Sequence, residues 1–249
     1  MYTSNKAVYL LTFWLTLCVT LFALCFSPEA KASEKITVCT GKAFGNKWHA
    51  TTNEFIQQAF AGTDLAVEVE TTPVKRAETN FKKKKCDAYF LAHRGFSNHI
   101  KRKDIFYIPQ AIFSASVKFY VLADSQCTAT NECLASFTDK DQIGTFSSLT
   151  LSQFLRKQTQ AKVVELPAVR QGIQMLNKGR IKAFAFPVVK PEHMPLGLND
   201  LHQLDNLTTT PLYLWLDNKY KPYANHLNLA IQALLSHRDF AFLTTKKAA

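Results

Sequence analysis

A helix–turn–strand unit occurs twice in this chain, and the repeat limits the folds that the chain can adopt. Residues 73–92 predict a helix with one apolar stripe, a basic turn and a strand that is buried on both faces. Residues 167–186 repeat this order. The corresponding pairs, 94 or 95 positions apart, are Pro73 and Pro167, Phe81 and Leu176, and Ala88 and Ala183. Because this period is too long for a solenoid, the repeat predicts two similar α/β lobes.

Strands and helices also alternate outside the two units, which is typical of an α/β protein with open sheets. The expected strands are 35–40, 65–70, 86–92, 117–122, 142–146, 162–166, 181–186 and 211–216. The expected helices are 51–61, 73–85, 149–157, 168–178 and 223–236. We expect loops at 41–48 and 190–210.

The first 32 residues have the pattern of a secretory signal peptide. Lys6 precedes an apolar run from Ala7 to Phe26, and Ala30 and Ala32 form an A-x-A cleavage signature. The alternative is an uncleaved membrane anchor, because the apolar run is long enough to span a bilayer. The break at Ser27-Pro28 and the cleavage signature favour removal after Ala32, and therefore a periplasmic protein.

Cleavage after Ala32 would leave 28 basic and 18 acidic residues, because it removes Lys6, Lys31 and Glu29. The resulting net charge of +10 favours an anionic ligand, a nucleic acid or a membrane surface, or it only keeps the protein soluble. The basic run 82–85 fits the end of a helix, where cations are stabilising. No nucleic-acid-binding signature accompanies the charge, and export argues against such a role.

Four cysteines remain after cleavage, and export permits disulfide bonds. Cys127 and Cys133 flank a short polar loop and are the expected pair, although three pairings are formally possible. Cys39 and Cys86 fall inside expected strands. If those strands are adjacent and parallel, the two residues are offset along them, so we interpret both as small buried residues rather than as a pair. Without paired Cys/His spacing, neither a metal nor a cofactor is expected.

Five stretches together resemble the bacterial extracellular solute-binding proteins of family 3, the amino-acid-type periplasmic receptors. They are PVKRAETNFKKKKCDAYFLAHR, KRKDIFYIP, QIGTFSSLTLSQFL, GIQMLNKGRIKAFAF and PLYLWLDNKYKPYANHLNLAIQALLS. Each stretch is degenerate by itself, but their order and spacing extend over nearly all of residues 34–245.

The resemblance implies the type II periplasmic-binding-protein fold. This α/β fold has two open lobes that are joined by two crossover strands, with a ligand cleft between them. We expect residues 33–117 in lobe 1, with 209–249 returning to it, and residues 118–208 in lobe 2. Such proteins capture a ligand by hinge closure, with contacts from both lobes.

Two arginines are candidates for binding a ligand carboxylate, as an arginine after the third strand does in the family. Arg94 stands at the end of strand 86–92, where open α/β sheets bind ligands. Arg102 matches the family's E-R position, but only after about four extra residues in the loop. The residues alone do not choose between the two.

The second lobe lacks an acid that the resemblance leads us to expect. In the family, a carboxylate just after the second-lobe strand holds the ligand ammonium, whereas here that strand ends in Phe186-Pro187. Because a buried ammonium without a charge partner is costly, an ordinary α-amino acid is not the expected ligand. We expect a carboxylate or other anion, or an aromatic or amphipathic molecule.

Other candidate ligand contacts lie in loops and at helix starts. They are Phe44, Trp48 and Phe186 as apolar walls, Arg76 at a helix start, Ser147 and Ser148 before a second-lobe helix, and His93 at a strand end. Each has a structural alternative: core packing for Trp48, a surface position for Arg76, N-capping for one serine, and a neutral hydrogen-bonded ring for His93.

These features predict a periplasmic protein that binds a small polar or anionic solute, amino-acid-like or a carboxylate. It would deliver this solute to an inner-membrane ABC permease or a sensor. We expect a monomer that binds no nucleic acid. Enzyme motifs such as G-x-S-x-G and H-E-x-x-H are absent. Some relatives of the implied fold are periplasmic dehydratases, however, so a lyase on this scaffold is an alternative, as is a ligand-sensing module without a transport role.

Overall fold

The computed structural model describes residues 34–42, 46–188, 201–205, 208–237 and 240. All of these except Glu34 belong to one compact unit, Lys35–Ala249. The expected signal peptide lies outside the described residues. Within the described part of the chain, no helix combines the length and the apolar character needed to cross a membrane.

Strands and helices alternate along the chain, largely as the sequence predicts. The strands are β1 (Glu34–Gly41), β2 (Leu65–Thr72), β3 (Ala88–Ala92), β4 (Ile105–Tyr107), β5 (Phe113–Leu122), β6 (Gln142–Phe146), β7 (Lys162–Leu166), β8 (Ala183–Val188), β9 (Leu201–Gln203) and β10 (Thr208–Asp217). The helices are α2 (Asn46–Phe60), α3 (Val74–Lys82), α4 (Phe96–Ile100), α5 (Thr130–Ser136), α6 (Leu149–Gln158), α7 (Val169–Asn177), α8 (Ala224–Ser236) and the 3₁₀ helix η2 (Asn218–Tyr223).

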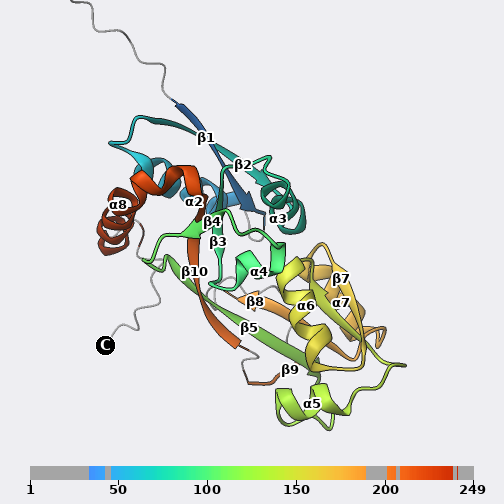
Figure 1. Cartoon of the computed structure of the whole chain (residues 1–249). Helices are drawn as coiled ribbons and strands as arrows, with labels where there is room; N and C mark the ends of the chain where they lie inside the picture. The colour runs from blue at the N-terminus through green and yellow to red at the C-terminus, as the bar shows by residue number, and fades with distance from the viewer. Residues whose placement is uncertain (1–33, 43–45, 189–200, 206–207, 238–239, 241–249) are drawn as a thin grey trace, which may run out of the picture. The chain divides into compact units, whose positions relative to one another are not determined.

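The strands form a curled sheet whose two halves meet at β5 and β10 (Figure 1). Its order is β2-β1-β3-β10-β5-β8-β6-β7, with β4 on β10 and β9 on β5. β1 is parallel to β3, and β6 is parallel to both β7 and β8. β10 runs antiparallel to β5 through Thr208–Leu212 and then antiparallel to β3 through Tyr213–Leu216. The long strands β5 and β10 therefore connect two parallel sheets.

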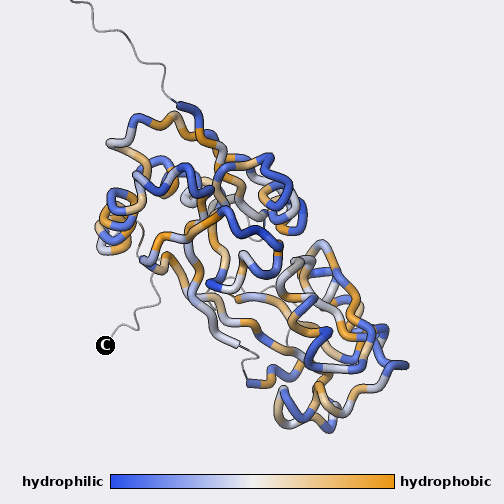
Figure 2. The backbone as a smooth tube through the Cα atoms, viewed as in Figure 1, coloured by the Kyte–Doolittle hydropathy of each residue, from blue (hydrophilic) through white to orange (hydrophobic). Residues whose placement is uncertain are grey.

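Apolar side chains cover both faces of each half of the sheet. In the first half, Phe55 of α2 and Leu227 of α8 belong to the core on one face, and Phe81 of α3 and Phe96 of α4 to the core on the other. In the second half, α5 and α6 cover one face and α7 covers the other. Figure 2 shows hydrophobic colour on parts of the central strands and hydrophilic colour over most of α3. The alternation of strands and helices thus gives two cores on one continuous sheet.

The repeated unit is confirmed in detail. Helix α3 buries Ala77, Glu78 and Phe81, and helix α7 buries the residues 95 positions later, Gly172, Ile173 and Leu176. Both helices end in the same turn, with a left-handed residue at Lys84 (φ 57°) and at Gly179 (φ 64°). In each turn, the next residue's N–H donates to a carbonyl five positions earlier, at 2.9 Å. This pattern is the Schellman C-cap.

Several expected boundaries need correction. The expected loop 190–210 contains β9 and the start of β10, and β5 begins at Phe113 rather than at residue 117. Helix α2 begins at Asn46 rather than Thr51, so Trp48 lies in a helix and not in a loop. Strand β3 begins at Ala88, and Cys86 lies in the turn before it. The segment between Cys127 and Cys133 was expected as a loop, but α5 occupies most of it because Thr130, Cys133 and Leu134 are buried on one side of the helix.

Candidate functional site

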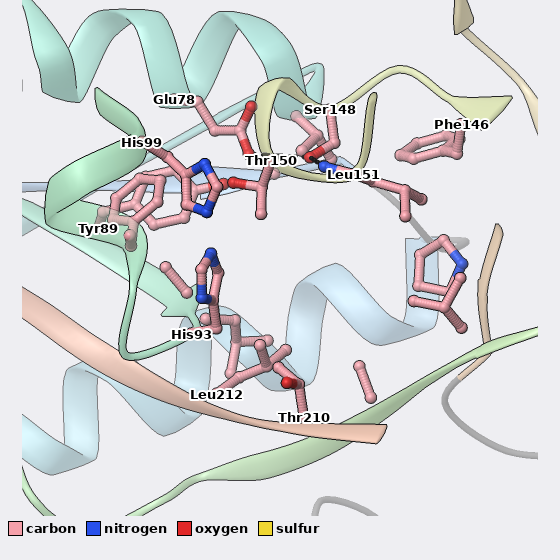
Figure 3. A pocket seen from close by; sticks show the side chains of 18 of the residues that line it. Glu78, Tyr89, His93, His99, Phe146, Ser148, Thr150, Leu151, Thr210 and Leu212 are labelled. Atoms are coloured by element: carbon pink, nitrogen blue, oxygen red, sulfur yellow. Dashed lines mark hydrogen bonds between the residues drawn. The ribbon is translucent and has the colours of Figure 1, made fainter. Parts of the chain in front are cut away.

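A cavity of about 300 Å³ lies at the carboxyl ends of β1 and β3, where they meet α3, α6 and the strands β5 and β10 (Figure 3). This is the edge at which open α/β sheets bind ligands. Residues from both halves of the sheet line it, including Tyr89 and Phe96 from the first half and Phe146 and Phe154 from the second. Its wall is therefore mainly apolar and aromatic, with a few polar groups that converge on it.

His93 follows directly after β3 and presents an uncharged donor to this cavity. The Gly95 N–H donates to His93 Nδ1 at 3.1 Å, which leaves the proton of the neutral ring on Nε2. Nε2 is buried and has no hydrogen-bond partner among the described residues. Burial, and next the His99 ring with its centroid 5.0 Å away, lowers the pKa of His93 to about 4. At neutral pH, His93 is therefore uncharged, as the structural alternative predicted.

Glu78 lies on the buried side of α3 and is only 4% exposed. The Ser148 hydroxyl donates to its Oε1 at 3.0 Å. Ser148 is also the N-cap of α6, since its Oγ accepts the Leu151 N–H at 3.4 Å. Figure 3 shows the Glu78 carboxylate directed towards Thr150 and the interior of the cavity. At this helix N-terminus, the hydroxyl expected to bind a ligand anion thus contacts the protein's own carboxylate.

The charge of Glu78 also affects its surroundings. Burial, and next the negative charge of Glu78, raises the pKa of Tyr89 well above its ordinary value. Among the described residues that line the cavity there is one carboxylate, Glu78, and no lysine or arginine. The cavity is therefore opposite in charge to the chain as a whole, and the expectation of an anionic ligand finds no support in its lining.

Two more contacts join the two halves of the sheet beside the cavity, one between α3 and β7 and one between α4 and α6. Lys75 Nζ of α3 lies 2.5 Å from Glu165 Oε2 of β7. His99 Nδ1 of α4 lies 3.1 Å from Gln153 Oε1 of α6. With the Glu78–Ser148 hydrogen bond, these contacts connect helices of the first half of the sheet to elements of the second half.

Arg102, one of the two candidate carboxylate ligands, lies outside the cavity lining. Its side chain is 4% exposed, donates to Phe81 O at 2.7 Å and to both carboxylate oxygens of Asp104 at 3.0 and 3.1 Å, and pairs with Asp217. The hydrogen bond from Arg102 holds the pKa of Asp104 well below its usual range, whereas burial raises that of Asp217. In the structure, Arg102 thus ties α3 to the segment before β4 and to the end of β10.

Arg94, the other candidate, is exposed and is not among the lining residues. Its Nε donates to the Tyr213 hydroxyl at 2.9 Å. Its guanidinium lies over the rings of Tyr213 and Tyr107, at 5.3 and 5.9 Å from their centroids. The structure thus places this arginine on an aromatic surface at the strand end rather than in the cavity.

The structure places the other predicted contacts as follows. Ser148 lines the cavity, whereas Ser147 does not, and its backbone N–H donates to Leu166 O at 2.9 Å. Arg76 is exposed on α3. Phe186 is buried in the second-half core, stacked on Tyr120 and Phe184. Phe44 and the Trp48 side chain lie outside the described part of the chain.

Sequence reasoning missed Glu78, His99 and Tyr89 as cavity residues. For Glu78 a signal was present, because it falls on the apolar stripe of α3 between Ala77 and Phe81. Its counterpart in the repeated unit is Ile173. In the sequence, this difference between an acid and an isoleucine is the feature that distinguishes Glu78 from the packing residues of the repeat.

Two disulfide bonds join cysteines within the described part of the chain. Cys127 and Cys133 are joined as predicted, with Cα atoms 5.2 Å apart. Cys39 and Cys86 are also joined, with Cα atoms 5.8 Å apart, so their interpretation as unpaired residues was wrong. Cys86 lies in the turn before β3 and not in the strand. The expected offset between two strand residues therefore does not apply, and the bond to Cys39 can form.

Glu70 lies beside the Cys39–Cys86 disulfide. Its Oε2 is 3.8 Å from each sulfur, and its Oε1 accepts a hydrogen bond from Asn80 Nδ2 at 2.9 Å. Cys39, Glu70 and Cys86 therefore bring potential ligand atoms within 4.8 Å of one another. Disulfide sulfurs carry no thiolate, however, so this group does not form a metal site in the oxidised protein.

Comparison with known proteins gives matches at the level of structure. No protein-family model and no curated protein sequence matches the chain. The substrate-binding protein of an amino acid ABC transporter superposes with a TM-score of 0.63 at 13% identity, over 84% of this chain and 96% of that one. Holo ArgBP from T. maritima gives 0.63 at 13%, over 86% and 96%. The GluR0 ligand-binding core from Nostoc punctiforme, in complex with (L)-glutamate, gives 0.63 at 13%, over 84% and 96%.

At this level of identity, the likeness concerns the fold. The superpositions extend over nearly the whole length of the neighbours and over most of this chain. The fold expected from the sequence is therefore confirmed: this chain has the two-lobed α/β architecture of the type II periplasmic binding proteins.

Proposed function

We propose that this protein captures a small solute in the cavity between its two lobes. The observation that carries the proposal is the cavity itself, whose volume of about 300 Å³ and mainly apolar wall with few polar groups suit a small molecule. Its lining comes from both halves of the sheet, so a bound solute would contact both lobes. The structural neighbours, among them a transporter's substrate-binding protein, are consistent with this role.

The body of the solute is apolar or aromatic in this proposal. Side chains such as Phe96, Phe146, Phe154 and Leu212 surround the space, and His93 Nε2–H supplies one hydrogen-bond donor. Of the ligands that the sequence left open, an aromatic or amphipathic molecule fits this lining. A simple carboxylate fits less well, because the described lining residues include no lysine or arginine to pair with it.

The remaining parts of the assignment follow from the sequence and belong to the same proposal. Cleavage after Ala32 would release the protein into the periplasm as a monomer. Residues 33–117 with 209–249 would form lobe 1, and residues 118–208 would form lobe 2. The partner would be an inner-membrane ABC permease or a sensor.

A lyase on the same scaffold would have to use the polar groups of the cavity as acid and base. Among the described contacts, the Ser148 hydroxyl donates to Glu78 and accepts from the Leu151 N–H, which is the arrangement of a helix N-cap. Incubation of the purified protein with prephenate-like substrates separates the two roles, because a receptor leaves them unchanged.

The binding proposal is tested by filling the cavity. Ala115 of β5 lines it, so Ala115→Trp should block the space, whereas Ala66→Trp on the exposed side of β2 is a matched control. We expect a panel of amines, amino acids and carboxylates to contain at least one solute that raises the melting temperature, by the equivalent of about 3 kcal/mol at a hundredfold excess over Kd. The shift should persist in Ala66→Trp and disappear in Ala115→Trp. A panel without any shift, or shifts that survive in Ala115→Trp, would contradict the proposal.

A further inference from the structure

Glu78 occupies a position that the fold itself does not require to be charged. The buried residues of α3 and α7 correspond one to one across the repeat, and Glu78 corresponds to Ile173. Ile173 is 4% exposed, as Glu78 is, and packs into the second-half core. The same helix face can thus be completed by an aliphatic side chain.

A carboxylate at such a position opposes folding unless it serves another purpose. Removing an ionised group from water is costly, and replacing even a buried ion pair with apolar side chains of similar size is often neutral or stabilising. Buried acids at the wall of a cavity are accordingly a signature of functional sites. Glu78 meets this description, because it lines the cavity and its carboxylate is directed into it (Figure 3).

The surroundings of Glu78 in the cavity suit a cation and not an anion. Tyr89, Phe96, Phe146 and Phe154 contribute ring faces or edges to the wall, and aromatic faces attract ammonium and guanidinium groups. His93 is neutral and brings no charge. The N-terminus of α6, which could otherwise bind a ligand carboxylate, is already engaged with Glu78 through Ser148.

We propose that the solute is an organic amine or guanidine without a carboxylate, whose cationic group pairs with Glu78 while its apolar body contacts the aromatic wall. This inference rests on the proposed solute-binding function and names the chemical class of the ligand. An ordinary amino acid is disfavoured because its carboxylate would have neither a lysine nor an arginine to meet among the described lining residues.

Two sets of matched probes test the charge independently of the body. The aromatic set is phenethylamine, phenylalanine and 3-phenylpropionate. The aliphatic set is isoamylamine, leucine and 4-methylpentanoate. Binding is measured by calorimetry and by thermal shift. In at least one set, we expect the amine to bind tenfold or more tightly than both the zwitterion and the carboxylate.

Glu78→Gln keeps the shape of the side chain and removes its charge, so amine binding should weaken at least tenfold, while carboxylate binding should stay equal or improve. Glu78→Ile, which copies the counterpart in α7, should fold with an equal or higher melting temperature and also lose amine binding. Ser148→Ala removes the hydroxyl partner but not the charge, and should retain the preference for the amine.

The outcomes distinguish this inference from the function on which it rests. If a carboxylate or zwitterion binds at least as tightly as its amine, or if Glu78→Gln leaves amine affinity unchanged, the cationic ligand is overturned and solute capture stands. If no amine binds, this inference is overturned. The proposed function is then decided by the wider panel with Ala115→Trp and Ala66→Trp.

Discussion

Two helix–strand units share one backbone arrangement but differ in their side chains. One contains α3 and β3, and the other contains α7 and β8. Their backbone turns and buried positions agree 95 residues apart. Three of the pairs that differ in polarity have their polar member at the cavity: Glu78 and Ile173, Tyr89 and Phe184, and His93 and Val188. In each pair, the polar member belongs to the first unit and lines the cavity, whereas the apolar partner belongs to the second-half core.

This difference in polarity accompanies a difference in packing. The second unit brings Phe184 so close to α7 that a Cβ on Gly172 would lie 2.2 Å from its ring. The first unit has Ala77 at the corresponding position and a tyrosine in place of the phenylalanine. The second unit is therefore closely packed at this point, whereas the corresponding positions of the first unit line a cavity, and we expect the first unit to depend more on other contacts.

Arg102 makes several such contacts, and its removal should have the largest effect of the changes predicted here. Arg102→Met would leave Asp217 half-buried without its cation and would remove the bond to Phe81 O, so we expect the free energy of unfolding to fall by about 3–5 kcal/mol. Urea denaturation followed by circular dichroism measures this loss. Arg94→Met, at an exposed arginine, is the control and should cost about 1 kcal/mol or less. Equal losses in the two variants would show that the buried contacts of Arg102 do not stabilise the first half more than an exposed arginine does.

The disulfides offer a second comparison between the halves. Cys39 and Cys86 are 47 positions apart, and Cys127 and Cys133 only 6. In the loop-entropy account, Cys39→Ala with Cys86→Ala should lower the free energy of unfolding by about 4 kcal/mol, and Cys127→Ala with Cys133→Ala by about 2 kcal/mol. Chemical denaturation of both double variants beside the oxidised parent measures the difference. A larger loss in the second half would mean that the first half does not depend on its long-range bond.

Much of the order of helices and strands could be predicted from the sequence because the helix–turn–strand unit occurs twice. The periodicity of buried residues and the turn after each helix predicted the helix–strand order, and the expected strand at Gln142–Phe146 agrees with β6 at both ends. The short elements α4 and α5 were missed, since five to seven residues contain too little periodicity for a prediction.

The site was less predictable, because its residues meet through the fold and not along the chain. Arginines near a strand end predicted a carboxylate site. In the structure, Arg102 instead pairs with Asp104 and Asp217. Asp217 lies 115 positions away along the chain, so no local sequence pattern indicates this contact. Ser148 was found because it begins a helix. Its partner Glu78 lies 70 positions earlier, and only the comparison with Ile173 distinguishes it from an ordinary helix residue.

The smallest expected effect concerns the turn that the two units share. Lys84 and Gly179 both have positive φ, a conformation that costs about 1–2 kcal/mol for a residue with a Cβ and nothing comparable for glycine. Lys84→Gly should therefore raise the free energy of unfolding by about 1 kcal/mol, because the exposed ion pair of Lys84 with Asp104 contributes little. Gly179→Ala, at a position with open space around it, should lower the free energy by a similar amount, through backbone strain alone. Thermal and urea unfolding of both variants measures these changes. If Lys84→Gly destabilised the protein, the ion pair would outweigh the backbone, and the two turns would be alike in shape but not in what stabilises them.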